Sequence, residues 1–178
     1  IYGKNDIPAH MVLMGAPGTG KDTVAKNFTD ALIGQKDAWR KHMHNINAIR
    51  NKEELWSILG SATGYVGSDS LSPLVHFIVE HSGGRYEIVK GQGAGGRDKE
   101  YVTENERWKP GMVAPGTFPP EQAVLYLNEF HDWSKEAKNL LVKELLETGR
   151  LKINNHNGGL HEVYFSGKII IATNEGLS

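Results

Sequence analysis

A glycine-rich stretch near the start of the chain has the residue types and spacing of a loop that binds phosphate. It reads GAPGTGKD from Gly15 to Asp22, after the apolar run 11–14 and before a helical pattern that begins at Thr23. Glycines permit close backbone approach, and the N–H groups that begin a helix attract anions. In the GxxxxGK spacing, Lys21 would reach the β- and γ-phosphates. The predicted nucleotide-binding residues are Gly15, Ala16, Pro17, Gly18, Thr19, Gly20, Lys21, Asp22 and Thr23.

Two positions that would hold a metal ion depart from the usual pattern. The residue after the lysine is normally Ser or Thr, whose hydroxyl helps to hold Mg²⁺, but here it is Asp22, with Thr23 one place later. Asn128 and Glu129 follow the apolar run 123–127, where phosphate-loop enzymes carry an acidic pair for Mg²⁺ and the attacking water. We therefore predict Asp22 and Asn128 as metal ligands and Glu129 as a catalytic residue. The two replacements are either a matched exchange that preserves the summed charge or independent decay of a site no longer used for hydrolysis.

The elements that must position these residues alternate between apolar runs and helical patterns. An apolar run at 169–173 ends at Asn174, whose amide could orient water near a γ-phosphate or simply cap the strand end. This alternation predicts an α/β fold of the P-loop NTPase type, a parallel sheet with helices on its faces. Asn157-Gly158-Gly159 between two apolar runs predicts a β-hairpin near the C-terminal end. Further strands are expected at 42–48, 123–127 and 169–173, and helices at 23–33, 52–59, 71–81 and 134–148.

Length and composition set limits on organisation and partners. The 178 residues predict one domain, 1–178, in which the glycine- and proline-rich segment 83–120 is a flexible surface insertion. The net charge of −1 gives no sign of a strongly basic nucleic-acid surface and leaves room only for a local patch. The chain has no cysteine, no run of 18 apolar residues and no signal peptide, so we expect a cytoplasmic protein without a membrane span. It begins without methionine, which indicates a piece of a longer protein.

The order of the motifs is more specific than any one of them. The phosphate loop is followed by LGSATGYVG at 59–67, the acid-ended strand, LLETGRL at 145–151 and IIIATNEG at 169–176. This order resembles the AAA+ ATPase core of the Clp unfoldase and disaggregase family, most closely its second ATPase module. The resemblance covers nearly the whole chain except 83–120. The GYVG motif is the specific part, whereas many families share the phosphate loop.

The resemblance implies a function and roles for single residues. It implies an ATP- and Mg²⁺-dependent motor that works as a hexameric ring and threads a polypeptide substrate. Glu129 matches the glutamate that polarises water, and Asn174 matches the sensor asparagine. The pore loop that grips the polypeptide would consist of Gly64, Tyr65, Val66 and Gly67.

Two other functions fit parts of the sequence. The altered positions Asp22 and Asn128 are also compatible with a nucleotide-gated scaffold that binds ATP and hydrolyses it weakly or not at all. The loop GAPGTGKDT also resembles the GxPGxGKGT loop of adenylate kinases, which would make the chain a small-molecule kinase. The GYVG and LLETGRL motifs have no explanation in a kinase.

Overall fold

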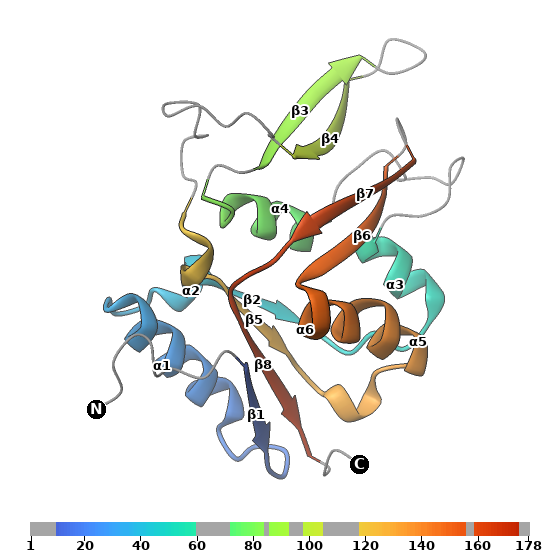
Figure 1. The fold of residues 1–178 in the computed structure, drawn as a ribbon. Helices are drawn as coiled ribbons and strands as arrows, with labels where there is room; N and C mark the ends of the chain where they lie inside the picture. The colour runs from blue at the N-terminus through green and yellow to red at the C-terminus, as the bar shows by residue number, and fades with distance from the viewer. Residues whose placement is uncertain are drawn as a thin grey trace. The chain divides into compact units, whose positions relative to one another are not determined.

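Four parallel strands form the sheet that carries the predicted phosphate loop (Figure 1). They lie in the order β1-β8-β5-β2, and every neighbouring pair is parallel. Their bounds are β1 His10–Met14, β2 Met43–Ile46, β5 Val124–Leu127 and β8 Lys168–Thr173. The computed structural model describes residues 10–59, 72–83, 86–92, 98–104, 118–155 and 159–174. The prediction of an α/β fold with a parallel sheet is confirmed, and the apolar run 124–127 lies inside the sheet, as expected.

The chain divides into two compact units. The first contains the sheet and consists of the described parts of Ile1–Ala48, Glu121–Trp133 and Ser166–Ser178. The second consists of the described parts of Ile49–Pro120 and Ser134–Phe165. The chain passes between the units four times, so no single linker marks their boundary in the sequence.

Helix α1, Lys21–Ile33, covers one face of the sheet in the first unit. Alternate side chains of β5 and β8 point to this face, as the two-residue period of a strand requires. The helix ends where glycine permits a left-handed turn: Gly34 has φ +83°, and its N–H donates to the carbonyl of Asp30 at 2.8 Å. The fully buried core between helix and sheet consists of Ala25, Val124, Tyr126, Ile170 and Ala172.

A short helix that the sequence did not predict, α2 (Trp39–His42), precedes β2. The carboxylate of Asp30 stabilises the start of this helix, because it accepts hydrogen bonds from the backbone N–H groups of Asp37 at 3.1 Å and of Trp39 at 2.9 Å. The ammonium of Lys26 lies 4.2 Å from the centre of the Trp39 ring, a cation–π distance. Helix α2 includes His42, and the strand predicted at 42–48 spans Met43–Ile46.

The described residues of the second unit form three helical segments and two antiparallel strand pairs. Helix α3 spans Lys52–Leu59, as predicted. Helix α4 spans Pro73–Glu80, and the Ser72 hydroxyl caps it by accepting the Val75 N–H at 3.3 Å. The third is α5 (Lys135–Ala137), the π-helical η4 (Lys138–Lys143) and α6 (Glu144–Thr148) in sequence. The paired strands are β3 Tyr86–Gln92 with β4 Asp98–Glu104, and β6 Arg150–Asn155 with β7 Gly159–Tyr164.

Two observations bear on what the sequence indicated. The described residues of 83–120, the segment expected as a flexible insertion, include the paired strands β3 and β4, and the flexibility itself stays a prediction. The helix expected at 134–148 has the predicted cap, with the Ser134 hydroxyl accepting the Ala137 N–H at 3.1 Å, but its middle is π-helical. The short 3₁₀ turns η2 (Pro120–Gln122) and η3 (Phe130–Asp132) flank β5. In the described part of the chain, no helix has the length and apolar character needed to cross a membrane.

Candidate functional site

The loop between β1 and α1 depends on its glycines at three positions. Gly18 and Gly20 adopt φ angles of +79° and +88°, in the left-handed region that side chains disfavour. Gly15 is closed to larger residues for another reason, since a Cβ there would lie 2.8 Å from the Thr19 hydroxyl oxygen. That hydroxyl donates to the carbonyl of Ala16 at 2.7 Å and closes the loop on itself. The spacing of the glycines is thus what this turn requires.

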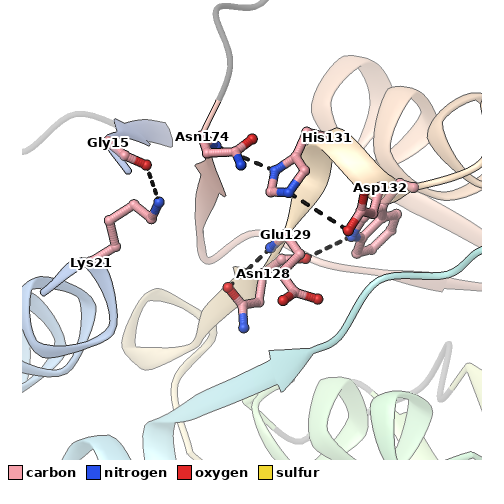
Figure 2. A network of polar contacts seen from close by, with 8 residues as sticks. Gly15, Lys21, Asn128, Glu129, His131, Asp132 and Asn174 are labelled. Carbon is pink, nitrogen blue, oxygen red and sulfur yellow. Dashed lines mark hydrogen bonds and ion pairs between the residues drawn. The ribbon is translucent and has the colours of Figure 1, made fainter. Parts of the chain in front are cut away.

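Lys21, the first residue of α1, folds back across the loop (Figure 2). Its ammonium donates a hydrogen bond to the carbonyl oxygen of Gly15. Gly15 itself is anchored to the sheet, because its N–H donates to the carbonyl of Thr173 at 3.2 Å. The lysine charge therefore lies beside the loop, at the helix end whose N–H groups also favour an anion.

The ends of β5 and β8 place two polar residues at the same edge of the sheet. The parallel register pairs Leu127 with Ile171, and Tyr126 and Ala172 both face α1. Because alternate residues of a strand share a face, Asn128 and Asn174 are the next positions toward α1. The sheet thus brings both residues to the loop that precedes the helix.

Asn128 is fixed by three hydrogen bonds. Its N–H donates to the carbonyl of Ile46 at 2.9 Å, and its carbonyl accepts the Trp133 indole N–H at 2.8 Å. Its side-chain oxygen accepts the backbone N–H of Glu129 at 3.0 Å (Figure 2). These bonds hold the turn at the end of β5 in one conformation.

Glu129 has a backbone conformation that is rare outside glycine. Its φ is +52° and its ψ is +46°, which costs about 1 kcal/mol or more for a residue with a side chain. Its N–H is held by Asn128, and its carbonyl accepts the Asp132 N–H at 2.9 Å. Strain of this kind is concentrated at functional sites.

A cavity of about 450 Å³ joins these parts of the first unit. It brings six of the nine predicted loop residues together with Asn128, Glu129 and Asn174. Its lining residues are Pro17, Gly18, Gly20, Lys21, Asp22, Thr23, Asn128, Glu129, His131, Ala172 and Asn174. Residues from the loop, from the end of β5 and from the end of β8 thus share one polar cavity of a size that holds small ligands.

His131 is a lining residue that the sequence did not predict. Its Nδ1 accepts the backbone N–H of Asn174 at 3.3 Å, and its Nε2 lies 3.6 Å from a carboxylate oxygen of Asp132 (Figure 2). With Nδ1 as acceptor, the neutral ring carries its proton on Nε2. The imidazole therefore connects the turn after β5 to the end of β8. Its position two residues after Glu129 was the only signal in the sequence.

Asp22 has a partner that the sequence did not reveal. Its carboxylate oxygen Oδ1 accepts a hydrogen bond from the hydroxyl of Tyr126. Burial, together with this hydrogen bond and the carboxylate charge, raises the pKa of the Tyr126 phenol, which therefore remains a donor at physiological pH. The matched exchange of Asp22 and Asn128 stays a prediction. Both residues line the cavity, but the observed hydrogen bond of Asp22 is to Tyr126.

The oxygen atoms around the cavity could bind Mg²⁺ if a nucleotide supplied further ligands. Asp22 supplies a carboxylate and Asn128 an amide, and Mg²⁺ in nucleotide sites uses one or two carboxylates together with phosphate oxygens and waters. Among the residues that the structure describes, no group of three or more His, Asp and Glu side chains could hold a metal by itself. The donor set fits an ion that arrives with phosphate.

The predicted pore loop of Gly64, Tyr65, Val66 and Gly67 lies outside the described residues. For the other predicted site residues, the support is their position in or next to the cavity described above.

Comparisons with known proteins correct the family prediction. No family model matches the chain, and no curated protein matches it. Among solved structures it is similar to NtrX from Brucella abortus, at 17% identity and a TM-score of 0.45 over 94% of this chain. The ADP and ATP complexes of NtrX give 17% and 18% identity with TM-scores of 0.47 and 0.45. The chain spans about a quarter of the NtrX chains, 25% to 26%.

The predicted membership in the Clp family is therefore wrong: the similar solved structures are of NtrX, and neither a family model nor a curated protein links the chain to Clp. The motifs that suggested it are either shared by many families or not described by the structure. A phosphate loop and an acid-ended strand build a site that many families share, and the specific motif, Gly64–Gly67, lies outside the described residues.

Proposed function

We propose that the first unit binds ATP with Mg²⁺ and hydrolyses the bond between its β- and γ-phosphates. The observation that carries this proposal is the single cavity lined by Lys21 from the loop and by Glu129 from the end of β5. A cation at a helix start and a carboxylate across a cavity are the two groups that this reaction needs most. One neutralises phosphate charge and the other polarises the attacking water.

The residues around the cavity would divide the work as follows. The loop N–H groups and Lys21 would bind the phosphates, with the lysine exchanging its bond to the Gly15 carbonyl for phosphate oxygens. Asp22, and Asn128 through a water, would hold Mg²⁺, which would neutralise the charge on the β- and γ-phosphates. Glu129 would accept a proton from the attacking water, and Asn174 would orient that water. The strained backbone of Glu129 fits such a placed side chain.

Steady-state phosphate release by the purified chain tests this function. We expect release that requires both ATP and Mg²⁺ and that ceases when EDTA removes the metal. Binding of Mg-ATP without release would favour the nucleotide-gated scaffold, which the replacements at Asp22 and Asn128 make the second candidate. ATP consumption that requires added nucleoside monophosphate would show a kinase instead. Absence of both binding and release would contradict the proposed function.

A further inference from the structure

We propose that Tyr126 is a positioning residue that holds the Asp22 carboxylate at the cavity as the protein's anionic ligand for the divalent cation of the nucleotide. The inference rests on the proposed function and adds to it a residue that lies outside the phosphate-loop pattern. It explains how a carboxylate could serve at the position where a short hydroxyl is usual. The assignment starts from one hydrogen bond between two elements that are far apart in the sequence.

The two residues meet because of where their elements lie. Tyr126 belongs to β5 and is 0% exposed, with its ring packed in the core between the sheet and α1. Asp22 is the second residue of α1, and it is exposed and lines the cavity. The phenol hydroxyl of Tyr126 donates a hydrogen bond to Oδ1 of Asp22 at the edge of this core. A phenol that is fixed by core packing therefore restrains a carboxylate that lines the cavity.

The chemistry of the pair leaves the carboxylate able to bind a cation. An ionised carboxylate has two oxygens and about four acceptor positions, and one phenol hydrogen bond occupies a single position. The phenol adds no charge, so the negative charge of Asp22 is preserved. A donor held in the core also restricts the side-chain rotamers of Asp22, which lowers the entropy lost when the carboxylate engages a metal.

A purely structural role for this hydrogen bond would have a different consequence. A buried phenol needs some acceptor, and Asp22 would satisfy it without any effect on a ligand. In that case, loss of the hydroxyl would leave the ratio of nucleotide affinities with and without metal at its wild-type value. A positioning role acts only when the metal is present. The dependence of nucleotide affinity on Mg²⁺ separates the two roles.

The test uses Tyr126→Phe, which removes the hydroxyl and keeps the ring, in the full chain. The dissociation constant of a non-hydrolysable ATP analogue is measured by calorimetry in Mg²⁺ and in EDTA, and bound Mn²⁺ is counted by electron paramagnetic resonance. We expect wild-type protein to bind the analogue at least tenfold more tightly with Mg²⁺. Tyr126→Phe should reduce this ratio to about threefold or less and change the EDTA value less than twofold. Tyr164→Phe, which removes a phenol from β7, should preserve the wild-type ratio.

Asp22→Asn provides the second variant, because its amide oxygen can still accept the phenol hydrogen bond while the charge is lost. It should lose the Mg²⁺ ratio and the bound Mn²⁺, and adding Tyr126→Phe to it should change little further. A Tyr126→Phe protein with the wild-type ratio would overturn the inference and leave the proposed function standing. Loss of the ratio in Thr23→Val, but not in Tyr126→Phe, would do the same. Wild-type protein that does not bind the analogue in either condition would overturn both.

Discussion

Replacing Glu129 by glutamine is expected to lower the rate of ATP hydrolysis by 100-fold or more and to change the Kd for Mg-ATP less than threefold. Glutamine preserves the size and polarity of the side chain, but its amide cannot accept the proton of the attacking water. A well-placed general base contributes about 10²- to 10⁴-fold to a rate. Single-turnover phosphate release measures the chemical step, and calorimetry with Mg-ATP measures the affinity.

Glu121→Gln is the matched control for this prediction. Glu121 is an exposed carboxylate in η2 that is not among the lining residues of the cavity. The Glu121→Gln protein should hydrolyse ATP at the wild-type rate. Wild-type turnover in Glu129→Gln would show that another group handles the water. A large loss of affinity in Glu129→Gln would assign the carboxylate to metal or nucleotide binding.

The second large effect is expected from Lys21→Ala, which should weaken ATP binding by about 100-fold, or roughly 2.7 kcal/mol. Lys21 is the only residue of the predicted loop that carries a positive charge, and it lies at the helix start that faces the cavity. Its loss removes a direct charge-assisted contact to the phosphates. The bond from its ammonium to the Gly15 carbonyl is also lost, so thermal unfolding should be measured in parallel.

Lys26→Ala removes the same charge from the same helix. Its ammonium lies over the Trp39 ring rather than in the cavity, so its Kd for ATP should stay within about threefold of the wild-type value. Equal weakening in the two variants would indicate a long-range effect of net charge. Unchanged binding in Lys21→Ala would contradict the role of the loop.

The sequence was sufficient for the parts of this fold that depend on local patterns. The apolar run 124–127 has no polar interruption, which is typical of a strand buried on both faces, and it lies inside the parallel sheet. The end of α1 at Gly34 follows from the ease with which glycine adopts a left-handed turn. Carboxyl ends of parallel strands meet at one edge, so residues 128, 129 and 174 could be placed beside the loop.

The parts that were missed depend on contacts that no local pattern contains. The hydrogen bond between Tyr126 and Asp22 joins residues 104 positions apart, and Tyr126 reads in the sequence as one more apolar residue of a strand. The role of His131 depends on the end of β8, which lies 43 positions away. The middle of the helical segment 135–148 is π-helical, with one extra residue in its turn, and the spacing of the apolar residues did not indicate this. The Clp assignment relied most on the motif at 64–67, which lies outside the described residues.

Hydrogen–deuterium exchange with and without saturating Mg-ATP tests the central claim most directly, because it locates the bound nucleotide without any substitution. We expect Mg-ATP to slow exchange in peptides that cover 15–24 and 128–131. Peptides from α3, Lys52–Leu59, should exchange at the same rate in both conditions. Protection confined to peptides away from the loop, or unchanged exchange at 15–24 under saturating Mg-ATP, would contradict the assignment of this cavity as the nucleotide site.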